Sequence, residues 1–355
     1  MVELADPLVG QGPPVVRHLT GLYPSVIRRA RRAWGPIYHS SNTRPAWAML
    51  RTTFGGRVRD LIARTLRRVE PDLVISVHPL LNHVAIDAIG RSARRRPPLA
   101  TVVTDLINLH RGWASARTDL VVVPTEAARE SMLRRGVPAA RLRTIGLPVA
   151  RQFRPASSEE KQQLRLGLGL DPLRPTLLMS SGAEGSSGLL DQVLSLCGDR
   201  NAWQVIVVCG RNAQVRRRLH RCRLRTPTRI FGYVDTMPDL MRASDLVVGK
   251  AGPGAIAEAL ATGLPILLTS YLPGQEAPNV RYVVQQEVGL YVKRPELLRG
   301  TVLQLLERDG AELARMTRRA ELAGGPGATD EIVDECLRLV GGRASLYWPL
   351  GQARR

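Results

Sequence analysis

Residues 247–268 read VVGKAGPGAIAEALATGLPILL and predict a strand, a glycine-rich turn, a helix and a second strand. Pro253 stands where the first residue of the helix is expected, because its fixed φ suits that position. Gly252 and Gly254 leave the backbone N–H groups at the helix start uncovered. Such a helix end carries about half a positive charge and free donors, which together attract phosphate. Glu258, one turn further along, is placed to accept hydrogen bonds from a ribose diol. An ordinary βαβ turn, with glycines for tight packing, would explain the glycines equally well.

The same alternation of strand and helix extends along most of the chain. Apolar runs of strand length occur at 72–77, 99–104, 120–123, 142–145, 176–180, 204–208, 229–231, 245–248 and 265–268. Strands that are apolar throughout and separated by helices indicate parallel sheets buried on both faces. We therefore predict an α/β fold with two tandem doubly wound domains. The cleft between them, at the carboxyl ends of the strands, is the expected ligand site.

The domain boundaries follow from breaks in this alternation. We predict an N-terminal domain at 1–150, a linker at 151–160, a second domain at 161–325 and a C-terminal helix with a basic tail at 326–355. Within the first domain, long helices are expected at 14–34 and 46–69.

Three further loops of the second domain follow predicted strands and carry small or polar residues. Small residues let backbone N–H groups approach a diphosphate, and backbone polar groups can meet a base edge. Amides and carboxylates suit sugar hydroxyls. The candidate donor-binding residues in these loops are Ser181, Gly182, Gly232, Tyr233, Gln275, Glu276 and Asn279. Neither the dinucleotide-binding fingerprint nor the P-loop pattern occurs, which disfavours redox enzymes and P-loop NTPases.

The composition is strongly basic, with a net charge of +20, and lysine supplies only three of the 51 basic residues. A solvated surface, an anionic membrane or nucleic acid would each suit this charge. No nucleic-acid-binding signature accompanies it, so no specific nucleic-acid partner is expected. Arginine clusters beside apolar residues at the predicted first helix favour a membrane-facing surface. Its candidate residues are Arg28, Arg29, Arg31, Arg32 and Trp34.

The chain shows no signal peptide, no apolar run long enough to span a bilayer and no paired cysteines. These features predict a cytoplasmic protein that associates peripherally with the inner face of the cell membrane. They also predict a protein without a metal or a resident cofactor.

Residues 250–259, followed by Gln275, Glu276 and Asn279, resemble the donor half of two-domain, GT-B-type glycosyltransferases that use UDP-sugars. The pattern is most similar to the monogalactosyldiacylglycerol synthase and processive diacylglycerol glucosyltransferase family, which is related to glycosyltransferase family 28. The N-terminal half carries matching motifs. They are Ser76 to Leu80, Val103 to Leu106, His110, Trp113 and Gly146 to Val149.

The resemblance implies a hexosyltransferase of glycolipid synthesis. It would move a hexose from UDP-galactose or UDP-glucose to diacylglycerol, with inversion at the anomeric carbon and with anionic membrane lipids as partners. The helix start at Gly252 to Gly254 would hold the diphosphate and Glu258 the ribose. Gln275, Glu276 and Asn279 would hold the sugar. Asp105, His110, Trp113 and His78 would line the acceptor side.

The sequence departs from the family pattern at its beginning. Relatives begin with an apolar strand that runs into a glycine-rich loop ending in a histidine, the usual candidate for the catalytic base. Nothing similar precedes residue 14 here, so we expect the first strand and loop of the N-terminal domain to be missing. Asp105 and His110 become the candidate catalytic residues. Two alternatives remain, an inactive UDP-sugar- and membrane-binding remnant and a GT-B enzyme with another lipid-linked acceptor, similar to an N-acetylglucosaminyltransferase.

Overall fold

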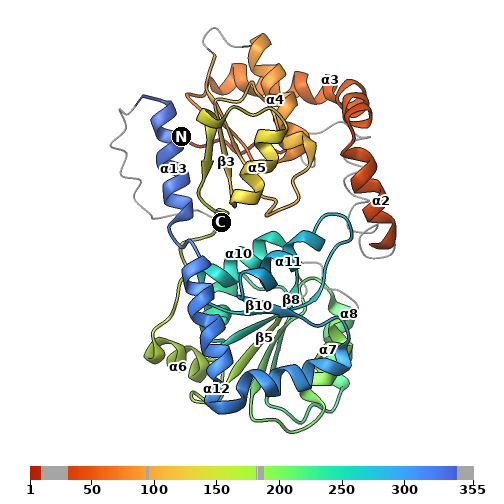
Figure 1. Cartoon of the computed structure of the whole chain (residues 1–355), viewed down its shortest axis with the longest axis vertical. Helices are drawn as coiled ribbons and strands as arrows, with labels where there is room; N and C mark the ends of the chain where they lie inside the picture. The colour runs from red at the N-terminus through yellow and green to blue at the C-terminus, as the bar shows by residue number, and fades with distance from the viewer. Residues whose placement is uncertain (9–30, 93–95, 181, 183–187, 342–355) are drawn as a thin grey trace.

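The computed structural model describes residues 1–8, 31–92, 96–180, 182 and 188–341. Two parallel β-sheets, each flanked by helices, form an upper and a lower domain (Figure 1). The expected pair of Rossmann-like domains is therefore present, and the sheets follow one another in the sequence as predicted.

The first domain is built on a four-stranded sheet of order β1-β2-β3-β4. The residues of β3 are all fully or almost fully buried, as expected for a leucine and three β-branched valines inside a parallel sheet. The strands are β1 (Val74–Ser76), β2 (Leu99–Val102), β3 (Leu120–Val123) and β4 (Leu142–Thr144). The helices are α2 (Arg31–Ser41), α3 (Arg44–Val69), α4 (Pro79–Ser92), α5 (Glu126–Arg134) and the 3₁₀ turns η1 (Arg111–Trp113) and η2 (Ala139–Arg141).

The second domain is built on a six-stranded sheet of order β10-β9-β8-β5-β6-β7. Its strands are β5 (Thr176–Ser180), β6 (Gln204–Val208), β7 (Thr228–Phe231), β8 (Leu246–Lys250), β9 (Ile266–Ser270) and β10 (Gly289–Tyr291). Its helices are α6 (Ser158–Gly167), α7 (Leu189–Cys197), α8 (Ala213–Arg221), α9 (Met237–Arg242), α10 (Pro253–Ala261), α11 (Ala277–Gln285), the 3₁₀ turn η3 (Pro295–Leu297) and α12 (Leu298–Ala323). The path of α12 is interrupted at residues 307–310, where the backbone is not helical.

The order of the second sheet reverses between β5 and β8, which pair in parallel with Met179 opposite Val248. Such a reversal leaves a crevice at the carboxyl ends of the two strands, where doubly wound sheets bind ligands. Gly249 lies in this region, and a Cβ atom there would come within 2.5 Å of the Ser180 carbonyl oxygen. Glycine at this position therefore allows β8 to approach β5 closely beneath the crevice.

Within the described residues the chain passes between the domains twice, and the two crossings lie side by side. After α12, helix α13 (Ala328–Leu339) returns to the first sheet, where Ile332 and Cys336 pack in one cluster with strands β2 and β3. Thr329 at its start accepts a hydrogen bond from Val149 N at 3.0 Å, and its hydroxyl donates to Val149 O at 2.6 Å. The first crossing and the second are thus joined by hydrogen bonds at the left of Figure 1.

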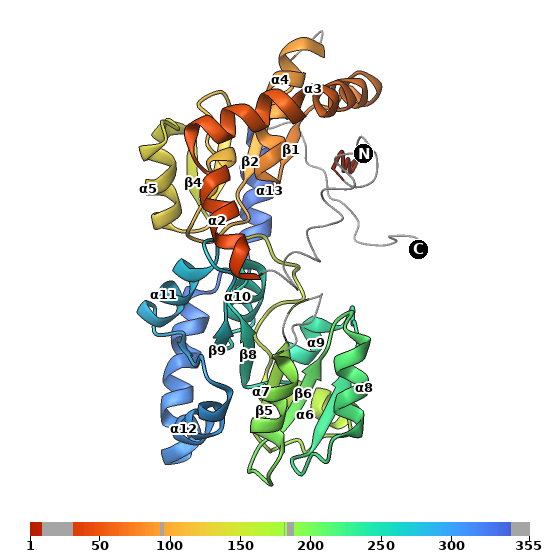
Figure 2. The ribbon, with the colours of Figure 1, turned by 90° about the vertical axis from the view of Figure 1, so that its right-hand side faces the viewer.

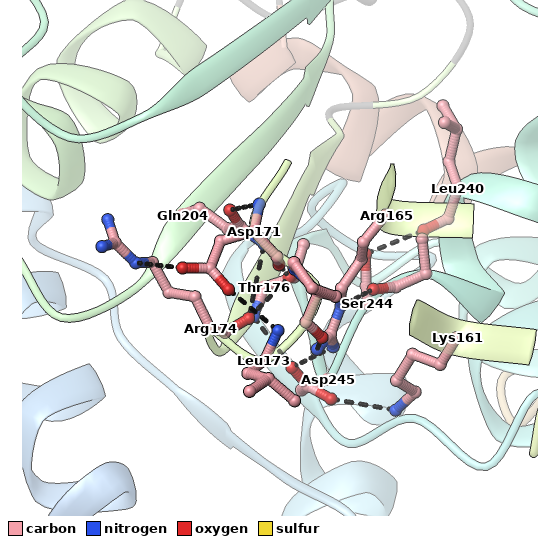
Figure 3. Close-up of polar contacts among 12 residues, drawn as sticks. Lys161, Arg165, Asp171, Leu173, Arg174, Thr176, Gln204, Leu240, Ser244 and Asp245 are labelled. Atoms are coloured by element: carbon pink, nitrogen blue, oxygen red, sulfur yellow. Dashed lines mark hydrogen bonds and ion pairs between the residues drawn. The ribbon is translucent and has the colours of Figure 1, made fainter. Parts of the chain in front are cut away.

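A hydrogen-bonded network closes the opposite end of the second sheet, at the amino ends of β5 and β8 (Figure 3). Arg165 of α6 donates to Asp245 Oδ2 at 2.6 Å and to the Ala243 carbonyl oxygen at 2.8 Å. Lys161 Nζ lies 2.9 Å from Asp245 Oδ1, and Thr176 N donates to Asp245 Oδ2 at 2.8 Å. This network fixes α6 to the sheet at a distance from the strand ends that form the crevice.

The observed elements differ from the expected ones in a few places. Strand β10 and helix α6 were not predicted, and α6 begins at Ser158, inside the predicted linker. Helix α2 extends to Ser41, beyond the predicted end at residue 34, although Pro36 lies within it. Most of the helix expected at 14–34, with Arg28 and Arg29, lies outside the described residues.

Candidate active site

A cavity of about 310 Å³ lies at the switch point of the second sheet. Ser180 and Gly182 border it at the end of β5, and Lys250 borders it at the end of β8. From the predicted donor residues, Gly182, Tyr233 and Glu258 line the cavity, whereas Ser181 lies outside the described residues. Three of the predicted donor residues therefore border this cavity, whose lining residues all belong to the second domain.

Helix α10 begins at the cavity wall, and Ala255 and Ile256 of its first turn line the cavity. Gly252 is the N-cap residue and Pro253 the first helical residue, as predicted; no side chain caps this end. Around Gly254, no described atom lies within 4 Å of the place where a Cβ would stand. The N–H groups at this helix start have no side-chain cap, and there is open space beside Gly254, an arrangement that suits the binding of phosphate oxygens.

Glu258 follows in the second turn of α10 and reaches the same cavity. Burial raises the pKa of its carboxyl group above the ordinary value, because the charged form loses hydration. A half-buried carboxylate in a cavity is a strong hydrogen-bond acceptor for hydroxyl groups of a ligand.

Lys250 and Glu276 form an ion pair beside the helix start, with Nζ 2.7 Å from Oε1. The other carboxylate oxygen of Glu276 accepts from Leu272 N at 2.6 Å, so both oxygens are engaged. Asn279 donates from Nδ2 to the Ala251 carbonyl oxygen at 3.0 Å, and its buried Oδ1 has no hydrogen-bond partner among the described residues. Lys250 was not among the predicted site residues, although it is one of only three lysines in the chain.

The loop after β7 borders the cavity on another side. Tyr233 is half exposed there, and the guanidinium of Arg211 lies 4.7 Å from the centre of its ring. Gly232 precedes it, and a Cβ at that residue would meet the Arg216 guanidinium at 3.1 Å. Two arginines therefore stand beside this part of the predicted donor site.

Asp105 faces the second domain from the loop that follows β2. Its Oδ2 accepts from Trp113 Nε1 at 2.8 Å, and its Oδ1 accepts from Gln275 Nε2 at 3.1 Å. Burial raises the pKa of Asp105, while these two hydrogen bonds and the backbone of His110 act in the opposite direction. Trp113 itself is completely buried, so its indole holds Asp105 from inside the first domain and does not line a surface.

His110 is the N-cap of the 3₁₀ turn η1, and its Nδ1 accepts from Gly112 N at 3.1 Å. The neutral ring then carries its proton on Nε2, which lies 3.4 Å from Ser41 Oγ. Burial and nearby arginines lower the pKa of His110 to about 4. A ring nitrogen already engaged as a cap cannot take a proton from a substrate, so this geometry favours Asp105 over His110 as the base.

His78 lies at the end of β1, where its Nδ1 accepts from Leu80 N at 3.3 Å. Its pKa is lowered by burial, against the attraction of Asp105. The neighbouring Val77 and Leu80 are both exposed. Two exposed apolar side chains therefore lie beside this histidine in the sequence.

Helix α2 reaches from the first domain to the second, towards α10 and α11 (Figure 2). Trp34 donates from Nε1 to Gln275 Oε1 at 3.3 Å. The predicted membrane-facing Trp34 thus contacts the donor loop instead. Arg31 and Arg32 lie in the first turn of the same helix.

The fold resembles solved GT-B glycosyltransferases and related enzymes. MurG of Acinetobacter baumannii superimposes with a TM-score of 0.56 at 14% identity, with 80% of each chain covered. HepE of Anabaena in complex with UDP gives 0.56 at 18% identity, covering 79% of this chain and 82% of that one. A putative UDP-N-acetylglucosamine 2-epimerase from Listeria monocytogenes gives 0.61 at 18% identity, covering 79% and 78%. The chain thus has a GT-B-type fold.

The family follows from sequence comparison. The family model for monogalactosyldiacylglycerol (MGDG) synthase matches residues 3–149, and that for the glycosyltransferase family 28 C-terminal domain matches residues 176–331. A probable monogalactosyldiacylglycerol synthase 2 from Oryza sativa subsp. indica is 32% identical, over 89% of this chain and 69% of its own length. The synthase of Spinacia oleracea is 34% identical, over 79% and 55%. The chain belongs to the monogalactosyldiacylglycerol synthase family and is a hexosyltransferase.

The comparisons contradict one expectation. These relatives are chloroplastic proteins, so a cytoplasmic location at the inner face of a cell membrane, inferred from the lack of targeting signals, is wrong for this family. Across the described residues, the helices lack a segment long and apolar enough to cross a membrane.

Proposed function

We propose that the chain transfers galactose from UDP-galactose to diacylglycerol. The observation that carries this proposal is the cavity at the switch point of the second sheet, bounded by an uncapped helix start and Glu258. Relatives that make monogalactosyldiacylglycerol support galactose as the sugar and diacylglycerol as the acceptor.

In this proposal the second domain binds the donor without a metal or a cofactor. The first turn of α10 receives the diphosphate, and Glu258 accepts from the ribose hydroxyls. The loops at Gly182 and at Gly232 to Tyr233 enclose the nucleotide. Lys250, Glu276 and Asn279 lie beside the helix start, where the sugar would extend. Positive potential from α10 and Lys250 stabilises the departing UDP.

The acceptor hydroxyl loses its proton to Asp105 while its oxygen forms the new bond to the anomeric carbon. The bond from that carbon to UDP breaks in the same step, and the configuration inverts. A carboxylate whose pKa is raised by burial is a stronger base than an exposed one. Trp113 and Gln275 aim this carboxylate across the space between the domains.

The acceptor enters from a bilayer surface beside His78. Exposed Val77 and Leu80 give this region an apolar character that suits acyl chains. The chain's net charge of +20 adds attraction to anionic lipids.

The test is incubation of the full chain with labelled UDP-galactose or UDP-glucose and vesicles that contain diacylglycerol. We expect a labelled monogalactolipid, formed faster with anionic vesicles than with neutral ones. Faster transfer from UDP-glucose would contradict the sugar assignment. UDP binding without any glycolipid would favour a non-catalytic binding protein.

Glu258→Gln should raise the donor KM at least tenfold, because a hydrogen bond from ribose to a half-buried carboxylate is worth about 1.5–3 kcal/mol. Steady-state kinetics with varied UDP-sugar measures this. Glu296→Gln, at an exposed position of the same domain, is the matched control and should leave KM unchanged. An unaltered KM in the Glu258 variant would remove the ribose role.

A further inference from the structure

Gln275 lies in the second domain, but both polar atoms of its side-chain amide are hydrogen-bonded to residues of the first domain. Its Nε2 donates to Asp105 Oδ1 at 3.1 Å, and its Oε1 accepts from Trp34 Nε1 at 3.3 Å. The two partners lie in separate segments of the first domain, the loop after β2 and helix α2. A surface glutamine rarely has this degree of fixation, because ordering its side chain costs conformational entropy.

The backbone around Gln275 is held to the same domain. Asn108 donates from Nδ2 to the Gly274 carbonyl oxygen at 2.7 Å. Gly35 of α2 packs so closely that a Cβ on it would meet Pro273 Cβ at 3.4 Å. Gly274 has a φ of +80°, and a Cβ there would meet Gly35 Cα at 3.0 Å. Both glycines thus allow the close approach of α2 to the donor loop.

These contacts lie across the molecule from the crossings at Val149 and Thr329. In Figure 1 the crossings are at the left and α2 is at the right. Separation of the domains at the α2 side would break the bonds of Gln275 while leaving the crossings intact. Asp105 would then keep Trp113 as a side-chain donor but lose Gln275.

We propose that Gln275 is a positioning residue, which fixes the Asp105 carboxylate for proton transfer and does so only when the two domains are closed. This proposal rests on the proposed function of the site. Gln275 acts through Asp105, and Trp34 acts through Gln275 by setting the plane of the amide. The amide has a second N–H on Nε2, so the same side chain can hold Asp105 and still donate to a sugar hydroxyl.

Both carboxylate oxygens of Asp105 accept a hydrogen bond. Trp113 occupies one oxygen from within the domain, and Gln275 occupies the other from across the gap. A carboxylate has about four lone-pair sites, so these two donors and the backbone of His110 leave room for a hydrogen bond from the acceptor hydroxyl. Each donor also favours the charged form of Asp105 and so opposes the effect of burial on its pKa.

The experiment compares Gln275→Met and Trp34→Phe with the unaltered chain. Gln275→Met keeps the length of the side chain but removes its donor and acceptor. Trp34→Phe keeps an aromatic ring and removes only the indole N–H. We expect kcat to fall at least tenfold in Gln275→Met and about threefold in Trp34→Phe, with the donor KM altered less than threefold. We also expect the acid limb of the pH profile to move to higher pH, further in Gln275→Met, because Asp105 loses a stabilising donor.

Gln275→Glu is a second variant, which replaces the hydrogen-bond donor to Asp105 by a negative charge. Its carboxylate still accepts from Trp34 but repels Asp105, so the acid limb should move further than in Gln275→Met. Gln285→Glu, at an exposed position on α11, is the matched control and should leave kcat and the pH profile unchanged. Thermal unfolding and UDP calorimetry on each variant identify any that fail to fold.

The Asp105 carboxyl is also titrated directly, by the carbon-13 shift of its carboxyl group, with Asp105→Asn giving the assignment. A higher pKa in Gln275→Met supports the proposal even if the unaltered chain makes no galactolipid, in which case only the proposed function fails. An unchanged titration together with a stationary pH profile overturns the positioning role. So does a defect confined to the donor KM, since that would mean that Gln275 serves the sugar alone.

Discussion

His110 illustrates at the scale of one residue how local geometry decides chemistry. The absence of the family's usual base histidine made it a candidate base, yet its Nδ1 caps η1 and its ring packs against Tyr38 and Trp47, at 5.7 and 5.3 Å between ring centres. Protonation would break the cap and place a charge in a buried aromatic environment. The residue therefore works best as a neutral ring.

This arrangement predicts a pH dependence of stability. The pKa of His110 falls from 6.5 to about 4 on folding, so the unfolded chain binds the extra proton in that interval. The contribution of the neutral His110 ring to the free energy of unfolding is complete above about pH 6.5 and is lost as the pH falls towards 4. His110→Asn keeps a cap acceptor but cannot titrate. Urea unfolding at several pH values should show a smaller loss of stability between these pH values than in the unaltered chain; an identical loss would contradict the role of His110.

At the scale of the element, η1 is fixed in place by its surroundings. Asn82 of α4 donates to the Trp113 carbonyl oxygen at 2.9 Å and accepts from Thr101 of β2 at 2.7 Å. Gly112 lies against the start of α4, because a Cβ on it would stand 2.5 Å from Pro79 O. The turn that carries Trp113, and through it Asp105, is thus tied to a helix and a strand.

Gly112→Ala tests how tightly this turn is packed. The added methyl would also meet Trp47 Cη2 at 2.9 Å, so either the turn or α4 must shift. We expect a loss of about 1–3 kcal/mol in unfolding free energy and slower transfer, because Asp105 moves with the turn. In Gly300→Ala, on α12, no described atom lies within 4 Å of the new Cβ, and helix propensity should stabilise the chain by about 0.5–1 kcal/mol. Equal effects of the two changes would contradict the packing argument.

The sequence predicted the elements that have a local signal. Strands β5 to β9 are mainly apolar runs, and α10 begins with a glycine-proline pair, so these elements were identified within two residues, whereas the short strand β10 was not. The contact of Gln275 with Asp105 joins residues 170 positions apart and leaves no periodic pattern in either segment. The capping role of His110 and the ion pair of Lys250 with Glu276 also depend on tertiary geometry. Helix α2 continued through Pro36, which sequence rules treat as a break.

On the scale of the whole molecule, the second domain has its stabilising polar network and its cavity at opposite ends of the same sheet. The network of Arg165, Lys161 and Asp245 lies at the amino ends of β5 and β8 (Figure 3), and the cavity lies at the carboxyl ends of the same strands. Arg165 is only 5% exposed, so its charge depends on Asp245 and on carbonyl oxygens for compensation. Changes in this network should therefore alter stability more than donor binding.

Arg165→Met should lower the unfolding free energy by about 1–3 kcal/mol, because Asp245 Oδ2 and the Ala243 carbonyl oxygen both lose a buried charged donor, although Asp245 keeps Lys161 as a cationic partner. Lys161→Met, which removes the more exposed partner of the same carboxylate, should cost less than about 1 kcal/mol. Urea unfolding measures both, and calorimetry below the unfolding range should give unchanged affinity for UDP. A loss as large for Lys161 as for Arg165 would refute this ranking.

The paired crossings at Val149 and Thr329 have a consequence for how the enzyme moves. A single linker would let one domain tilt, twist and translate against the other. Two chain segments that are hydrogen-bonded side by side act as a hinge. They restrict the domains to rotation about an axis that passes near Val149 and Thr329. Opening is then greatest at α2, on the opposite side of Figure 1 from the crossings. The same movement would admit a substrate and break the hydrogen bond from Gln275 to Asp105. The open arrangement of the domains therefore serves substrate entry, and the closed arrangement positions Asp105 for catalysis.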